Sequence, residues 1–90
     1  MYKLETTSKF RKDLKLMKKR GRDMKLLKQV LDKLLAGETL PPKYRDHALT
    51  GNYIGFRECH IQPDWLMVYM ISEAKLILTA SRTGSHSDLF

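Results

Sequence analysis

Apolar side chains recur every third or fourth position through the first part of the chain, which predicts two amphipathic helices. Thr7 or Ser8 can cap the start of the first helix, and Gly21 ends it. The positions between its apolar residues are mostly Lys and Arg, so its outer side is cationic. Its apolar face is formed by Phe10, Leu14 and Met17.

A broader apolar stripe predicts a second helix directly after the first. Asp23 can cap its start, Gly37 stops it, and Pro41-Pro42 prevents its resumption. The two helices are therefore expected to form an antiparallel hairpin whose apolar stripes cover a sheet. The stripe of the second helix consists of Met24, Leu27, Val30, Leu31, Leu34 and Leu35.

The second half of the chain changes to the pattern of β-strands. Three strands are predicted, at residues 53–61, 66–71 and 75–82. The connections at 62–64 and 72–74 are short, so these strands form an antiparallel meander. With a short strand at residues 2–5, the sequence predicts one α+β domain over residues 1–90. Its order is β-α-α-β-β-β, with the helical hairpin packed on one face of the sheet.

Charge is distributed unevenly between the two halves of the chain. Residues 1–45 hold 14 Lys and Arg against 5 Asp and Glu, while residues 46–90 hold 3 against 5, giving +9 and −2. Such a basic half can attract a polyanion through its phosphates, or it can simply keep the surface soluble. Three lysines of the first helix are candidates for contact with RNA: Lys15, Lys18 and Lys19.

Several features argue against membranes, disulfides and metals. No apolar run approaches the ~18–20 residues that span a bilayer, and the first five residues lack a signal-peptide profile. The single cysteine, Cys59, cannot form an internal disulfide. Together these features favour a cytoplasmic protein with no membrane partner. Cys59 and His60 point to opposite faces of a strand and lack zinc-module spacing, so neither a metal nor another cofactor is predicted.

The chain has three histidines, all in its second half: His47, His60 and His86. Histidine titrates near neutrality and can exchange protons at working pH. In an antiparallel meander the first and third strands point the same way, so the strand ends at His60 and Arg82 meet at one edge of the sheet. The turn that carries Asp64 and the tail that carries His86 lie near this edge. Proton-transfer groups on a basic protein predict an enzyme that cuts RNA.

Three motifs of the second half closely resemble YafQ-type toxins, members of the RelE/ParE superfamily of bacterial type II toxin–antitoxin systems. The motifs are Asp46-His47-x-Leu49-x-Gly51, Phe56-Arg57-Glu58-Cys59-His60-Ile61-x-Pro63-Asp64-Trp65-Leu66-x-Val68-Tyr69, and Arg82-Thr83-Gly84-Ser85-His86-Ser87-Asp88-Leu89-Phe90. The resemblance covers essentially the whole chain and implies a RelE-like toxin domain. It implies a ribosome-dependent endoribonuclease that cuts messenger RNA in the A site of the 70S ribosome, with the basic half contacting ribosomal RNA.

The resemblance also implies a partner. Toxins of this family are neutralised by a cognate antitoxin, commonly a ribbon-helix-helix protein, and the pair represses its own operon. Contact with operator DNA is therefore expected only through the antitoxin.

Chemistry and resemblance together assign roles to the site residues. Metal-free RNA cleavage needs a base for the 2′-OH, an acid for the 5′-oxygen and a cation for the phosphorane. We expect His60 and His86 to supply the acid and the base. Asp64 is expected to transfer protons with them or to orient and charge a histidine. Arg82 supplies the cation, and His47 is a further acid/base or phosphate-contacting group.

Two aromatic residues are expected to stack on unpaired bases: Trp65 and Phe90. Structural alternatives accompany several of these assignments. Trp65 can pack at the edge of the core, Phe90 can close the core or be disordered, Asp64 can serve only as a turn former, and His47 can be a solvated surface residue.

Two other functions compete with RNA cleavage. A ParE-like inhibitor of DNA gyrase would need no cluster of titratable groups, so the three histidines argue against it. A non-catalytic RNA- or ribosome-binding protein would depend on the lysines of the first helix and not on His86.

Overall fold

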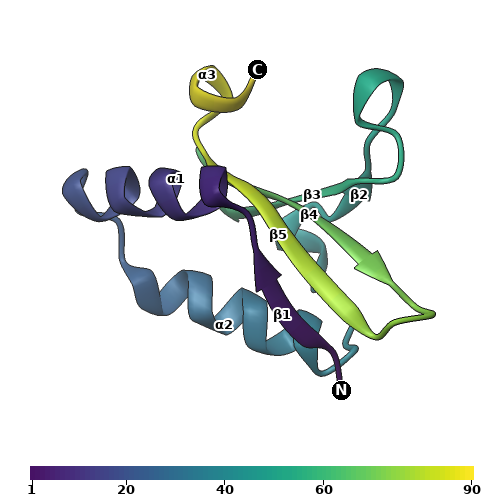
Figure 1. Cartoon of the computed structure of the whole chain (residues 1–90). Helices are drawn as coiled ribbons and strands as arrows, with labels where there is room; N and C mark the ends of the chain where they lie inside the picture. Colours follow the sequence, from purple (N-terminus) through teal and green to yellow (C-terminus); the bar gives the residue numbers. More distant parts are fainter.

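The computed structural model describes all residues, 1–90, and has the predicted α+β fold with element order β-α-α-β-β-β (Figure 1). Four shorter elements are added to this order. None of the helices is both long and apolar enough to cross a membrane. In chain order the elements are β1 (Lys3–Thr6), α1 (Ser8–Lys19), α2 (Met24–Leu35), the 3-10 helix η1 (Pro42–Tyr44), β2 (His47–Ala48), the 3-10 helix η2 (Gly51–Tyr53), β3 (Arg57–Gln62), β4 (Trp65–Ser72), β5 (Ile77–Gly84) and α3 (His86–Leu89).

Side-chain caps begin both long helices at the predicted positions. The Thr7 hydroxyl accepts a hydrogen bond from the backbone N–H of Phe10 at 3.0 Å. The Asp23 carboxylate accepts one from the backbone N–H of Lys25 at 2.9 Å. After α1 the chain turns at Gly21, whose φ of 82° glycine adopts without strain. The two helices run in opposite directions, which confirms the predicted hairpin (Figure 1).

Five strands form one mixed sheet in the order β1-β5-β4-β3-β2. The neighbours β3, β4 and β5 form the predicted antiparallel meander. β1 adds a parallel edge strand, in which Lys3 lies opposite Ile77 of β5. A parallel pair needs a long crossover connection. The helical hairpin supplies part of that crossover.

Three strand boundaries differ by two or more residues from the sequence-based expectation. β3 begins at Arg57 and not at residue 53, because Gly51–Tyr53 form η2 and Gly55 has a φ of 94° that interrupts an extended chain. β5 begins at residue 77, because Leu76 lies in the preceding turn with a φ of 54°, and it continues to Gly84. This extension carries β5 directly into α3, a helix that the sequence pattern did not predict.

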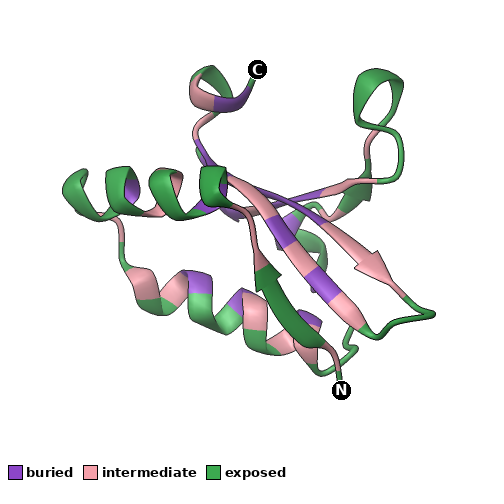
Figure 2. Cartoon of the chain, in the orientation of Figure 1, coloured by how far each residue is buried: buried purple, intermediate pink, exposed green.

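The sheet has two different faces. Both long helices cover one face, while their outward sides are exposed (Figure 2). On the other face, α3 and the loop containing η2 both project from the strands (Figure 1). Leu89 of α3 packs there on Leu66 and Val68 of β4. The main core, between helices and sheet, contains Phe10, Met17, Leu27, Val30, Leu34, Cys59, Ile61, Trp65, Met67, Tyr69, Leu78 and Ala80.

Candidate functional site

The strand register brings the ends of β3 and β5 to one edge of the sheet. His60 of β3 lies opposite Leu66 of β4, and Leu66 lies opposite Gly84 at the end of β5. The chain then enters α3, whose first residue is His86. As a result, the ring centroids of His60 and His86 lie 6.3 Å apart. The convergence expected from the meander topology is therefore present.

A buried carboxylate lies between two of the histidines. Glu58 precedes His60 by two residues in β3, so the two side chains share a face of the sheet. The Glu58 side chain is 5% exposed, and its Oε1 lies 3.6 Å from Nε2 of His60 and 3.8 Å from Nε2 of His47. Glu58 was not among the site residues predicted from the sequence. No group of three or more His, Cys, Asp or Glu side chains in the structure is arranged to hold a metal ion.

Local hydrogen bonds position His47 at the outer edge of the sheet. The residue before it, Asp46, accepts a hydrogen bond from the hydroxyl of Tyr69, and burial together with this bond raises the pKa of Tyr69. His47 itself is exposed, and its Nδ1 lies 2.7 Å from the carbonyl oxygen of Arg45. Its place in β2 is directly opposite Glu58. His47 therefore reaches the same carboxylate as His60 but stays open to solvent.

Arg82 is held in place by a carboxylate from α1. Its Nε and Nη2 lie 2.7 Å and 3.1 Å from the two carboxylate oxygens of Asp13, which also accepts the backbone N–H of Thr83 at 3.1 Å. The hydrogen bonds to Asp13 raise the pKa of Arg82, so the guanidinium stays charged. Arg82 lines a cavity of about 280 Å³ together with Tyr53 and Phe90. The cation is thus both oriented and accessible from the open face.

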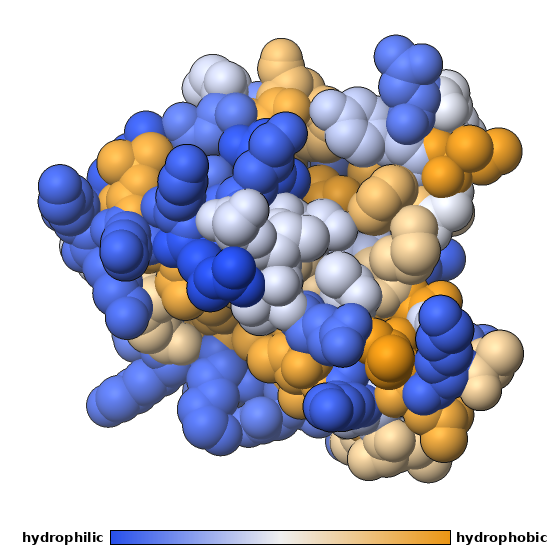
Figure 3. All heavy atoms as spheres, viewed as in Figure 1, coloured by the Kyte–Doolittle hydropathy of each residue, from blue (hydrophilic) through white to orange (hydrophobic).

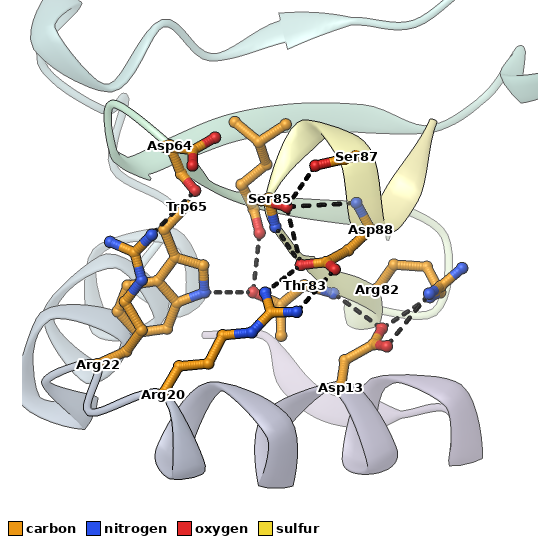
Figure 4. Close-up of polar contacts among 11 residues, drawn as sticks. Asp13, Arg20, Arg22, Asp64, Trp65, Arg82, Thr83, Ser85, Ser87 and Asp88 are labelled. Atoms are coloured by element: carbon orange, nitrogen blue, oxygen red, sulfur yellow. Dashed lines mark hydrogen bonds and ion pairs between the residues drawn. The ribbon is translucent and has the colours of Figure 1, made fainter.

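Polar contacts fix α3, which is only one turn long (Figure 4). Ser85 and Asp88 form a capping box, in which the Asp88 carboxylate accepts the Ser85 backbone N–H at 2.8 Å. Arg20, at the end of α1, binds the same carboxylate with its Nη1 and Nη2 at 2.6 Å and 3.0 Å. Hydrogen bonds from Arg20, and then from Ser85, hold the pKa of Asp88 well below its usual range. Because His86 belongs to this helix, the contacts also set its position.

Comparisons with known proteins decide the family. Residues 2–90 match the family of bacterial toxins of type II toxin–antitoxin systems, YafQ.

The chain belongs to the YafQ family.

It is 39% identical over 89 residues to the mRNA interferase toxin YafQ of Escherichia coli strain K12, with 97% of this chain and 94% of that protein covered. A metal-bound toxin from Helicobacter pylori superposes with a TM-score of 0.94 at 49% identity over the full length of both chains. A chain of the E. coli DinJ–YafQ toxin–antitoxin complex superposes with a TM-score of 0.89 at 37% identity, with 99% of this chain and 97% of that chain covered.

The YafQ family confirms two expectations from the sequence. The fold is RelE-like, and the enzyme class, an mRNA interferase or endoribonuclease, is that of the curated relatives. The ParE-like alternative, a toxin without chemistry of its own, is not favoured by this family.

Trp65 does not have the position expected of a base-stacking residue. It is fully buried in the main core. Its Nε1–H donates to the hydroxyl of Thr83 at 2.8 Å, and that hydroxyl donates to the carbonyl oxygen of Leu66 at 2.8 Å. The guanidinium of Arg22 lies 5.8 Å from its ring centroid. The prediction that Trp65 stacks on RNA was therefore wrong, because neither face of the indole is free, and the packing alternative is correct.

Phe90 lies at the surface of the site. Its side chain is among the exposed large hydrophobic groups, with 55% of the residue accessible. Its ring centroid is 5.8 Å from that of His86 and 5.4 Å from that of Tyr53. The aromatic expected to meet a base is thus next to an imidazole of the site. Its stacking role stays a prediction.

Asp64 does not contact a histidine, as one of its expected roles requires. It is exposed in the β3–β4 turn, and its carboxylate forms no hydrogen bond or ion pair with a histidine. Its backbone carbonyl accepts a hydrogen bond from Arg22 at 3.2 Å. The prediction that Asp64 orients a histidine was therefore wrong in this arrangement, because Glu58 occupies that place. A role for Asp64 in proton transfer stays a prediction.

The three lysines of α1 named as RNA contacts are all exposed. None of Lys15, Lys18 and Lys19 forms an ion pair. Hydrophilic side chains gather over α1 in the space-filling view (Figure 3). These cations are therefore free to attract phosphates, unlike Arg20, which is bound to α3.

Proposed function

We propose that this YafQ-family chain is a ribosome-dependent endoribonuclease of the cytoplasm that cuts messenger RNA in the ribosomal A site and so stops translation. The observation that carries the proposal is the pair of imidazoles, His60 and His86, whose ring centroids are 6.3 Å apart on the open face. A base and an acid must act on the same phosphodiester, so two histidines at this separation fit the reaction. The E. coli relative is named an mRNA interferase, which supports the substrate class.

The reaction uses the substrate's own 2′-OH as nucleophile and needs no metal. One imidazole removes the 2′-OH proton while the 2′-oxygen attacks the adjacent phosphorus. The bond from phosphorus to the 5′-oxygen breaks, and the other imidazole, as imidazolium, gives its proton to that oxygen. The products are a 2′,3′-cyclic phosphate and a 5′-hydroxyl. His60 and His86 share these two tasks.

Arg82 and Glu58 provide the electrostatics of the step. Two of the five N–H groups of Arg82 bind Asp13, which leaves three to bind the non-bridging oxygens of the phosphorane. The basic side chains within 4 Å of the Glu58 carboxylate are those of His47 and His60. As a buried carboxylate it stabilises an imidazolium in the way the triad aspartate does in serine proteases.

Three further residues complete the site in this proposal. Phe90 stacks on a base next to the scissile phosphate, as aromatic side chains do with single-stranded RNA. His47, exposed beside Glu58, contacts a phosphate or exchanges protons. Asp64, exposed in the turn after His60, exchanges protons with solvent or substrate.

The basic half of the chain binds the ribosome. Lys15, Lys18 and Lys19 are exposed cations without carboxylate partners, and they contact ribosomal RNA through phosphates. Binding through these residues is expected to weaken steeply with salt.

The partner in the cell is a cognate antitoxin, as in the E. coli DinJ–YafQ toxin–antitoxin complex. We propose that it is of the ribbon-helix-helix type and that operator DNA is bound through it. An antitoxin that covers the open face would block the histidine pair.

Primer extension on translated mRNA tests the proposal. Wild-type protein should produce breaks in a message only when ribosomes are present. His86→Ala should lower the rate by 10²-fold or more, about what general acid–base catalysis contributes, while co-sedimentation with ribosomes is retained. The triple substitution of Lys15, Lys18 and Lys19 by Gln should weaken co-sedimentation instead.

Two results would overturn parts of the mechanism. An intact message with stalled ribosomes would exclude cleavage. Since the H. pylori relative is metal-bound, the reaction is repeated with EDTA. A rate that falls with EDTA and returns with a divalent cation would contradict the metal-free step.

A further inference from the structure

A second, larger cavity opens beside His60. Its volume is about 650 Å³, within the usual range of small-ligand sites, and it lies between α2, η1 and the end of β3. β2 pairs only with Arg57 and Glu58, so the rest of the outer edge of β3 has no strand neighbour and forms one wall. His60 lines this cavity, and its ring is also 6.3 Å from that of His86. A polymer bound at the histidine pair can therefore continue into it.

The charged groups of this cavity are all of one sign. Lys43 and Arg45 line it, both are exposed, and neither forms an ion pair, while no carboxylate lines it. Arg45 has a φ of 48° at the end of η1, and its carbonyl oxygen lies 2.7 Å from Nδ1 of His47. The local backbone thus presents two adjacent cations next to the histidines. Such a lining favours an anionic ligand.

The cavity also contains an amide whose orientation is determined. Nη1 of Arg22 lies 2.8 Å from Oε1 of Gln62. A guanidinium only donates hydrogen bonds, so Gln62 must turn its oxygen to Arg22 and keep its two N–H donors for another acceptor. Arg22 is itself held by the carbonyl oxygen of Asp64 and lies over the ring of Trp65. Gln62 is therefore a preorganised donor in the wall of the cavity.

We propose that this cavity binds the nucleotide next to the scissile phosphate, with Lys43 and Arg45 holding its phosphate and the Gln62 amide donating to an acceptor on its base. The inference rests on the proposed RNA cleavage and extends it to specificity. Phosphate contacts position a nucleic acid, whereas contacts to base edges select sequence. Gln62 is thus a residue that contributes to the choice of cleavage site.

Binding of short RNA to the full chain carrying His86→Ala tests the subsite. The probes are single-stranded RNA pentamers whose scissile 2′-OH is replaced by hydrogen, in four versions that differ in the base 3′ or 5′ to that position. Fluorescence anisotropy over a range of salt gives Kd and its salt slope. Lys43→Gln and Arg45→Gln should each weaken binding several-fold and lower the slope by about 0.7 per cation removed. Lys75→Gln, in the turn at the far end of β4 and β5, removes the same charge as a control.

Gln62→Glu tests the base contact with little change of shape. The new carboxylate still accepts from Arg22 but has no N–H donor. The negative charge of the new carboxylate weakens the binding of all four RNAs by the same factor. Only the ratios among their Kd values therefore report the base contact. We expect the preference of the parent protein among the four RNAs to be lost. Thermal unfolding confirms that each variant is folded.

Three results would overturn the subsite. Lys43→Gln and Arg45→Gln could behave like the Lys75→Gln control. The ratios among the four RNAs could be unchanged in Gln62→Glu. A polyglutamate peptide of the same charge could bind as tightly as RNA, which would show that the cavity selects acidic peptides and not nucleotides. Cleavage by the wild-type chain is scored separately by primer extension, so a loss of the subsite and a failure of the proposed function are distinguishable.

Discussion

Removing the Arg20 guanidinium should release α3 from α1 and slow RNA cleavage without unfolding the chain. A four-residue helix is far too short to be stable alone. It is held by the Ser85–Asp88 capping box, by the buried side chain of Leu89, and by the two hydrogen bonds from Arg20 to Asp88. Because these contacts are few, the loss of one should appear directly in the fraction of molecules that hold His86 in place.

The magnitude follows from the exposure of the pair. The side chains of Arg20 and Asp88 are 44% and 21% exposed, so solvent screens their attraction. Exposed pairs contribute little, and the bidentate, charge-assisted geometry places this one at the upper end of what such pairs contribute. Arg20→Gln should therefore lower kcat by up to about fivefold. Asp88→Ala also removes half of the capping box, about 1 kcal/mol more, and the limit becomes about thirtyfold.

Single-turnover primer extension and hydrogen exchange of the Leu89 and Phe90 amides measure this effect. Both amides should exchange faster in Arg20→Gln, with the midpoint of thermal unfolding nearly unchanged. Lys12→Gln is the matched control, because it removes the same charge from an exposed residue of α1 that forms no ion pair and is not among the proposed RNA contacts. Equal kcat values for Arg20→Gln and Lys12→Gln would refute the positioning role. An effect of Arg20→Gln on KM alone would do the same.

The pair should be insensitive to pH near neutrality. Arg20 lowers the pKa of Asp88 below its usual range. The stabilisation of α3 by this pair is therefore fully present above about pH 3.9, the pKa of an aspartate in the unfolded chain. It is lost only as the pH falls through the lower pKa that Asp88 has in the folded chain. Any change of rate between pH 5 and 9 must come from other groups of the site.

Three further changes test other parts of the structure. Glu58→Gln, which keeps the side-chain shape, should lower kcat by about 10²-fold in primer extension with stability unchanged or raised; an unaltered kcat would remove this carboxylate from the site. Trp65→Phe should reduce the free energy of unfolding in urea by about 1–2 kcal/mol, because Thr83 loses its donor and the smaller ring leaves a cavity. Its RNA affinity should stay the same, and a weaker affinity at full stability would restore the base-stacking role. Burial raises the pKa of Cys59 to about 12, so at pH 8 a thiol reagent should modify it only as fast as the chain unfolds, and rapid modification would contradict its burial.

The elements that the sequence predicted well are those specified by local patterns. The two helices have clear apolar periodicity and side-chain caps at Thr7 and Asp23. The meander follows from three β-rich segments and two short turns. The elements that were missed depend on distant contacts. β2 has only two residues and follows Asp46, which accepts a hydrogen bond from Tyr69. α3 depends on Arg20, which is distant in the sequence but binds Asp88 directly.

The same distinction applies to the site. The approach of His60 to His86 could be predicted because it follows from strand direction alone. Glu58 could have been found, since alternation placed it on the same side of the strand as His60, and a carboxylate there needs a positively charged neighbour when it is buried. The sequence left open whether Trp65 packs in the core or stacks on RNA, and its burial decides the choice. This burial depends on the pairing of β4 with β5, which brings the Thr83 hydroxyl to the indole N–H.

Helix α1 has two roles that its composition alone does not separate. Asp13 and Arg20 are seven positions apart, two helical turns, so they lie on the same side of α1 as the buried Met17. From that side Asp13 holds Arg82, and Arg20 holds the helix that carries His86. The exposed lysines on the other positions are left to attract phosphates. Asp13, a carboxylate within a run of cations, therefore marks the side of α1 that holds the site together. Arg20 on the same side shows that part of the positive charge of α1 organises the site and does not bind RNA.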